Sequence, residues 1–75
     1  MSVKWIPVDK RLPPIEKGYK NITETVLVKL INNTYDEAFC DNRNMQWWHF
    51  ICDKQAPQKL YKRVIAWAEY EKGGI

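Results

Sequence analysis

The chain offers few side chains for chemistry: one histidine, His49, and two cysteines, Cys40 and Cys52. A cysteine beside a histidine could act as a nucleophile activated by a base. In the strand register predicted below, Cys52 lies on the opposite sheet face from His49, and Cys40 lies several residues away from it along the sheet. A zinc site needs about four Cys or His ligands, and the three glycines form no loop that could cradle a phosphate. The sequence therefore predicts no enzyme, no metal site and no cofactor.

A first group of candidate binding residues lies on one face of the predicted sheet. This face combines a large aromatic residue with polar neighbours, namely Trp47, His49, Lys29 and Asp36. An exposed tryptophan ringed by polar groups is typical of a hot spot for protein binding. The alternative is that the N-terminal segment or the last element covers Trp47 in a second small core, because Trp47 and Trp48 must point to opposite faces.

A second group of candidates interleaves basic residues with an aromatic residue: Lys59, Tyr61, Lys62 and Arg63. Proteins that bind single-stranded nucleic acid combine phosphate contacts with base stacking in this way. Nearby acidic residues such as Asp53 weaken that interpretation. The same residues could contact an acidic protein partner or form a solvated edge, so nucleic acid ranks behind protein as the expected partner.

The size and composition of the chain indicate one small globular domain over residues 1–75. Ten residues are aromatic and 45% are hydrophobic, which lets so short a chain bury a core. The net charge of +3 is mild and favours solubility more than nucleic-acid binding. No apolar run approaches the roughly 20 residues that span a bilayer, and the first residues lack the apolar segment of a signal peptide. We therefore expect a cytoplasmic protein without a membrane partner, whose two cysteines are free and partly buried.

A three-strand antiparallel meander is predicted between Glu24 and Cys52. Residues 25–31 are rich in β-branched types and run into Asn32 and Asn33, which tolerate the positive φ of a two-residue hairpin turn. A second strand would follow over residues 34–40, then a turn at 41–44 and a third strand over 45–52.

The turns suggest a register in which Ile31 faces Thr34 and Cys40 faces Met45, so that the polar candidates of the first group face one another. One face would then form the core, with Val26, Val28, Leu30, Tyr35, Phe39, Trp48, Phe50 and Cys52. The other face would carry Leu27, Lys29, Asp36, Ala38, Trp47, His49 and Ile51. A shift of one residue in either hairpin would exchange the faces.

Both ends of the chain are expected to pack on this meander. Residues 5–8 should be extended, because a proline pushes the residue before it out of the helical region. The closing element, at residues 62–70, reads as a strand, but Leu60, Val64 and Trp67 also recur at helical spacing. The predicted fold class is therefore mainly β, or α+β if the closing element is a helix.

Several short motifs spread over most of the chain carry a family resemblance. They are Trp5-Ile6-Pro7-Val8 with Leu12-Pro13, Val26-Leu27-Val28, a tryptophan at 47 or 48, and Val64-Ile65-Ala66-Trp67. They resemble the "W-I-P-V…L-P" opening, the next strand, the tryptophan and the closing "V-T-H-W" strand of the bacterial and phage domain-of-unknown-function 551 family. The resemblance implies a small β-rich fold, occurrence in phage and prophage genomes, and no established activity. The chain departs from the family's "P-L-P" after the last motif, where it has Ala68-Glu69-Tyr70; the resemblance favours the closing strand over the helix.

Together these observations predict a small non-catalytic binding module. Its expected partner is a protein that binds around Trp47, and the resemblance suggests a phage or prophage accessory factor that modulates or inhibits a host protein. The alternative is a weak nucleic-acid-binding protein that uses residues 59–63. A homodimer could form through an outer strand, since the backbone donors and acceptors on its open side are unpaired.

Overall fold

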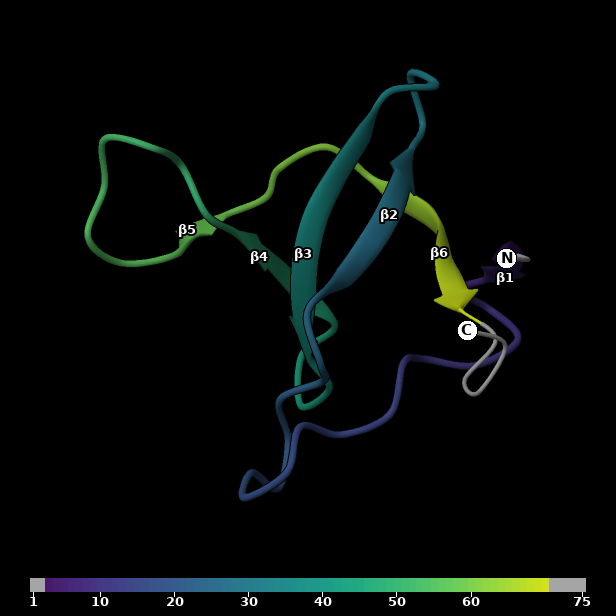
Figure 1. The fold of residues 1–75 in the computed structure, drawn as a ribbon, viewed down its shortest axis with the longest axis horizontal. Coiled ribbons are helices and arrows are strands. Elements are labelled where there is room, and N and C mark those ends of the chain that lie inside the picture. Colours follow the sequence, from purple (N-terminus) through teal and green to yellow (C-terminus); the bar gives the residue numbers. More distant parts are fainter. Residues whose placement is uncertain (1–2, 71–75) are drawn as a thin grey trace.

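The computed structural model describes residues 3–70, except the side chain of Tyr70, and these residues form an antiparallel sheet without a helix. The six strands are β1 (Val3–Pro7), β2 (Val26–Leu30), β3 (Tyr35–Asp41), β4 (Gln46–His49), β5 (Gln58–Lys59) and β6 (Val64–Tyr70). Their order across the sheet is β1-β6-β2-β3-β4-β5 (Figure 1). The predicted mainly β fold and the meander of β2, β3 and β4 are confirmed. Within the described residues no helix is long and apolar enough to cross a membrane.

The turn between β2 and β3 is one residue longer than predicted. Asn33 has a positive φ of 66°, and its N–H donates to the carbonyl of Leu30 (2.9 Å), while the N–H of Leu30 donates to the carbonyl of Thr34 (2.8 Å). Residues 31–33 therefore form a three-residue loop that ends in a left-handed residue, a common hairpin connection. Oδ1 of Asn32 completes the loop by accepting bonds from the backbone N and Oγ1 of Thr34.

This difference of one residue exchanges the faces that the predicted register assigned. The aliphatic side chains of β2 share the core face with Cys40 and Trp47. Three residues that were expected in the core are exposed instead: Tyr35, Phe50 and Cys52. The expected exposure of Trp47 is wrong, because only 7% of this residue is accessible. Trp47 is covered, but in the main core rather than in a second small one.

Asp41 organises the turn between β3 and β4. It pairs with Gln46 across residues 42–45, where Met45 takes a positive φ of 58°. The Asp41 carboxylate accepts bonds from the backbone N and Nε of Arg43, both at 3.0 Å, and from Nη2 at 2.7 Å. These bonds lower the pKa of Asp41. The pair therefore stabilises the turn fully above the ordinary pKa of the carboxyl group, and this contribution is lost as the pH falls through the lowered pKa.

The pairing of β3 with β4 also differs from the predicted one, here by two residues. Cys40 faces Trp47 rather than Met45. A shift of two residues leaves every side chain on the same face relative to β3. Only the first turn therefore caused the exchange of faces.

The closing element is a strand, β6, which lies between β1 and β2. Its pairing with β2 shifts between Lys29 and Leu30 and leaves Ile65 without a partner on β2. This is a β-bulge, which inserts one extra residue into one strand. The bulge lets Val64 and Trp67, three positions apart, both enter the core, where they are 5% and 1% exposed. In the sequence, the same spacing of three residues is also typical of a helix, which is why the closing element was ambiguous.

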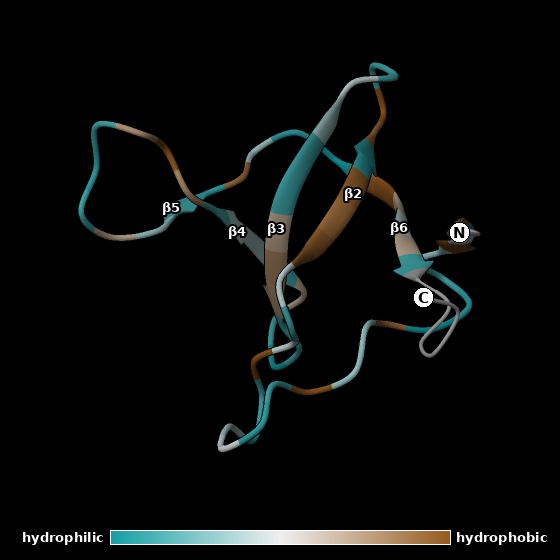
Figure 2. Cartoon of the chain, viewed as in Figure 1, coloured by the Kyte–Doolittle hydropathy of each residue, from teal (hydrophilic) through white to brown (hydrophobic). Residues whose placement is uncertain are grey.

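The core lies on the face of the sheet that β1 and β6 share with the meander. Both ends of the chain were expected on the meander; β6 pairs with β2 there, whereas β1 pairs with β6 at the outer edge. The buried residues of the core are Ile6, Val28, Leu30, Ala38, Cys40, Trp47, Leu60, Val64 and Trp67. Figure 2 shows the matching apolar stretches on β2 and on the first part of β6. Trp67 Nε1 donates to the carbonyl of Arg11 (2.9 Å), and the Arg11 guanidinium lies 5.2 Å from the indole centroid. Arg11 is held there by Glu69 (2.9 Å), so these contacts fasten the chain after β1 over the end of the core.

Thr23 fastens the segment between β1 and β2 to β3. Its Oγ1 is buried, accepts a bond from the backbone N of Cys40 (2.8 Å) and donates to the carbonyl of Glu24 (3.1 Å). Thr23→Val keeps the side-chain shape but leaves the Cys40 N–H without this acceptor. We expect the free energy of unfolding to fall by about 1–3 kcal/mol, measured by urea denaturation. Thr25→Val, at an exposed position nearby, should change it by less than about 0.5 kcal/mol; equal losses would contradict the role of Thr23.

Candidate binding groove

An open groove with a volume of about 400 Å³ lies between the β2–β3 hairpin and the segment that begins at β5. It is lined by Leu30, residues 34–36, His49 and residues 59–62. We call this site the groove. It brings together members of both predicted binding groups, since Asp36 and His49 belong to the first group and Lys59, Tyr61 and Lys62 to the second.

A hydrogen-bonded pair, Asp36 and His49, forms one wall of the groove. Nδ1 of His49 lies 2.7 Å from Oδ2 of Asp36, so the prediction that these residues meet is confirmed. They meet diagonally, because His49 pairs directly with Ala38. An ionised carboxylate can only accept hydrogen bonds, so beside an ionised Asp36 the proton lies on Nδ1. Oδ1 of Asp36 accepts a second bond, from the backbone N of Glu37 (2.8 Å), and both carboxylate oxygens are thereby engaged.

The arrangement around His49 bears on chemistry as well as on binding. A histidine oriented by a carboxylate is one part of a nucleophilic site, which also needs a hydroxyl or thiol group within hydrogen-bond distance. Within residues 3–69, no hydrogen bond joins His49 to such a group, and no cluster of His, Cys, Asp and Glu has the make-up of a metal site.

The opposite wall of the groove is held in place by backbone bonds to β4. The N–H of Leu60 donates to the carbonyl of Trp47 (2.9 Å), and Nε2 of Gln46 lies 3.4 Å from the carbonyl oxygen of Leu60. The Leu60 side chain enters the core, and in an extended chain its neighbours must point the other way. Lys59 and Tyr61 are accordingly exposed, and Tyr61 is 88% accessible.

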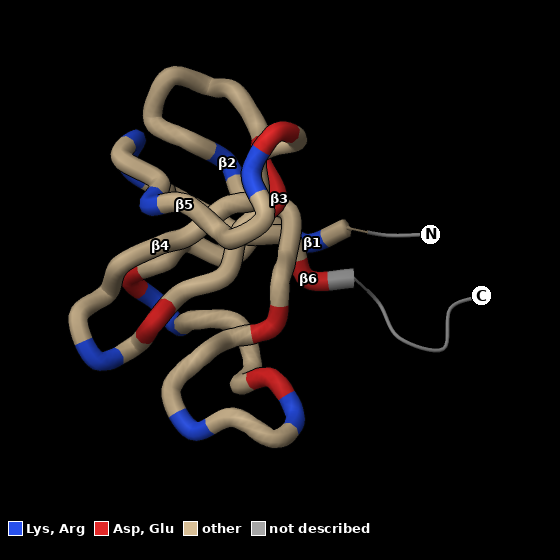
Figure 3. Tube along the Cα trace, turned by 90° about the vertical axis from the view of Figure 1, so that its left-hand side faces the viewer, with Lys and Arg blue, Asp and Glu red and all other residues tan. Residues whose placement is uncertain are grey.

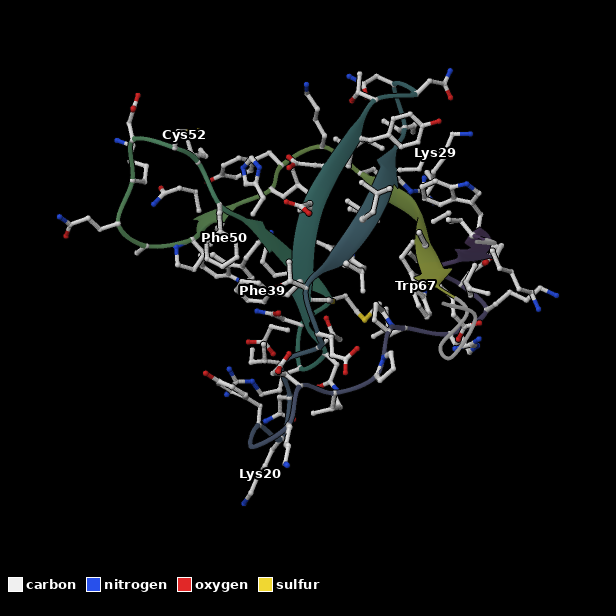
Figure 4. The ribbon with its side chains drawn as sticks, viewed as in Figure 1. Lys20, Lys29, Phe39, Phe50, Cys52 and Trp67 are labelled. Carbon is white, nitrogen blue, oxygen red and sulfur yellow. The ribbon has the colours of Figure 1, made fainter. Side chains whose placement is uncertain are left out.

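Three predicted site residues lie outside the groove. Trp47 is in the core. Lys29 pairs with Tyr35 on the other side of the sheet, apart from the buried face (Figure 4). Arg63 is exposed, and its carbonyl oxygen accepts a bond from the backbone N of Ile31 (2.9 Å), so it contributes to the junction of β2 with β6.

The sequence prediction missed the part of the groove that the hairpin supplies. Leu30 and Thr34 flank the loop at residues 31–33, and Tyr35 follows it. Their positions would have followed from predicting a three-residue turn with Asn33 in the left-handed region. The ring of Tyr35 lies on the other face of the sheet from Asp36, where it packs against Trp5 with the ring centroids 5.6 Å apart.

Charged positions of both signs are visible on one side of the molecule. In the view of Figure 3, lysine and arginine positions are grouped around β5 and β2, and basic and acidic positions are mixed in the lower part. A nucleic-acid-binding domain usually presents a basic stripe or patch on one face. The groove therefore provides a local positive region on a mixed surface.

The two thiols differ in burial and should differ in reactivity. Cys40 is fully buried, and burial together with the charge of Asp41 raises its pKa to about 11. Cys52 is exposed in the loop between β4 and β5 (Figure 4). Because the thiolate is the reactive form, we expect one thiol per folded chain to react with a disulfide reagent at neutral pH, and both after denaturation. Cys52→Ser should abolish the fast reaction and Cys40→Ser should leave it; rapid reaction of both thiols in the folded chain would contradict this.

No family model, curated protein or solved structure matches the chain. The resemblance to the domain-of-unknown-function 551 family stays a prediction.

Proposed function

We propose that the chain is a non-catalytic binding module that captures a partner protein at the groove. The observation that supports this most is the convergence of two distant parts of the sequence: the Asp36–His49 pair and residues 59–62 line the same hollow. Leu30 and Leu60 supply apolar surface beneath polar walls. Binding sites commonly combine an apolar floor with a few placed polar groups in this way.

Tyr61 takes the role that Trp47 held in the sequence prediction. Tyrosine is enriched among the residues that dominate binding energy, because it combines a large apolar ring with a hydroxyl group. At 88% exposure, Tyr61 has most of its surface available for burial by a partner. Its segment is held by the backbone bond at Leu60, so the ring is presented from a fixed position.

The biological setting in this proposal rests on the family resemblance alone. We propose a phage or prophage accessory factor that acts in the cytoplasm and modulates or inhibits a host protein. Self-association through the outer strands of the sheet, β1 or β5, is a further prediction.

The proposed function can be tested by affinity capture from a bacterial lysate with and without nuclease. We expect a stoichiometric protein that survives nuclease and is lost when Lys59→Glu and Lys62→Glu are combined. A matched control, Lys17→Glu with Lys20→Glu, makes the same charge change in an exposed loop away from the groove (Figure 4). Equal loss in both variants would contradict the groove. Bound material that disappears with nuclease would instead support nucleic acid as the partner.

A further inference from the structure

The lysines of the groove lack anionic partners within the described part of the chain. The ion pairs among residues 3–69 are Arg11–Glu69 and Arg43–Asp41, and the hydrogen-bonded His49–Asp36 pair joins them only when the imidazole is protonated. Lys59 and Lys62, both exposed, belong to none of them. Asp36, the carboxylate that lines the groove, is already paired with His49. While His49 is neutral, two lysines face the single carboxylate of Asp36, so the charged groups that line the groove leave an excess of one positive charge (two minus one).

His49 adds a charge that depends on pH. Its Nδ1 is committed to Asp36, so an added proton would go to Nε2 and turn an acceptor into a donor. Histidine is the side chain that ordinarily changes charge between about pH 5 and pH 8. The other titratable groups that line the groove are Asp36 and Tyr35 from β3, Lys59 from β5, and Tyr61 and Lys62 from the following segment. Among these, Asp36 is the only carboxylic acid, and its Oδ2 lies 2.7 Å from Nδ1 of His49.

We propose, building on the proposed function, that the groove binds an acidic segment of the partner protein and that protonation of His49 tightens this binding. A carboxylate on the segment would face Lys59 and Lys62, and neighbouring apolar side chains would contact Leu30 and the ring of Tyr61. The charge complementarity favours an anion, and the apolar floor favours a peptide. Nucleic-acid binding draws most of its affinity from neutralising several phosphates along a basic stripe or patch, whereas the groove supplies two lysines.

A pair of synthetic peptides tests this inference. The probe is the capped peptide Leu-Glu-Tyr-Glu-Leu, and its neutral counterpart has glutamine in place of both glutamates. Glutamate stays largely ionised above about pH 6, so any pH dependence between about pH 6 and pH 8 reports on the protein. We expect the acidic peptide to bind the full chain at least about fivefold more tightly at the lower pH, and the neutral peptide to bind more weakly at both, as followed by NMR titration.

Variants of the full chain complete the test. His49→Gln retains a donor for Asp36 but cannot gain a proton, so it should flatten the pH dependence. Lys62→Gln should weaken binding at both pH values, and Lys20→Gln should not. Equal binding of the two peptides, no binding of either at millimolar concentration, an unchanged pH dependence in His49→Gln, or preferential binding of a single-stranded oligonucleotide would each overturn the inference. The proposed function would survive these outcomes, except preference for the oligonucleotide, if lysate capture of a protein still depended on Lys59 and Lys62.

Discussion

Replacing Trp67 with alanine is expected to lower the free energy of unfolding by about 3–5 kcal/mol, as large aromatic truncations in cores do. The side chain is 1% exposed, and its indole N–H donates to the carbonyl of Arg11. The substitution would leave a cavity at the centre of the core and a carbonyl without its donor. A small domain is stable by only about 5–15 kcal/mol, so the variant should be largely unfolded in modest urea, as measured by circular dichroism.

Trp5→Ala is the matched control for this prediction. Trp5 lies on the neighbouring strand, β1, but it is 38% exposed and its ring stacks on Tyr35 at the surface. We expect it to cost about 1 kcal/mol, the scale of one aromatic pair and partial burial. If Trp5→Ala destabilises the chain as much as Trp67→Ala, the assignment of Trp67 to the centre of the core is wrong.

Replacing Tyr61 with alanine should have the opposite profile, with little effect on stability and a large effect on binding. Because Tyr61 is 88% exposed, its removal should change the free energy of unfolding by less than about 0.5 kcal/mol. If its ring is a hot spot, truncation costs about 2 kcal/mol or more, which corresponds to a loss of affinity of roughly 30-fold. Titration of the captured partner against the purified variant measures this loss.

Tyr19→Ala provides the control for Tyr61. Tyr19 is also largely exposed, at 60%, and it does not line the groove. Its removal should leave the affinity for the partner unchanged. A similar loss of affinity in both variants would mean that exposed aromatic surface in general, rather than the groove, drives capture.

The meander could be predicted from the sequence because its strands and turns carry strong local signals. The β-branched run before Asn32 and the polar cluster after Cys40 indicated where the two turns lie, although the bounds of both turns differ from the predicted ones. The register could not be predicted as well, since it depends on which residue of the turn takes the positive φ. The pair Asn32-Asn33 suits a two-residue turn as well as it suits the three-residue loop in the structure. The three-residue loop, with Asn33 in the left-handed region, moves every side chain of β2 to the other face relative to β3.

The closing strand was ambiguous for a different reason, which is the bulge at Ile65. A regular strand places buried residues two positions apart, but the bulge separates Val64 and Trp67 by three. Periodicity alone reads that spacing as a helix. The pairing with β1 and β2 that resolves it comes from residues far away in the sequence.

The candidate site was predicted in parts but not as a whole. Asp36 and His49 lie near each other in the meander, so even an inexact register brought them together. Residues 59–62 lie at the groove because the backbone N–H of Leu60 donates to the carbonyl of Trp47. This contact joins residues far apart in the sequence, so no local pattern predicts it. Trp47 was assigned to the surface because the predicted register was one residue off at the turn between β2 and β3.

Amide hydrogen exchange of the full chain, with and without its captured partner, tests the central claim most directly. If the groove is the binding site, exchange should slow on binding at residues 34–36 and 58–62, and it should stay unchanged at residues 17–20. Protection confined to residues 17–20 or to the outer strand β1, with the groove unaffected, would contradict the account.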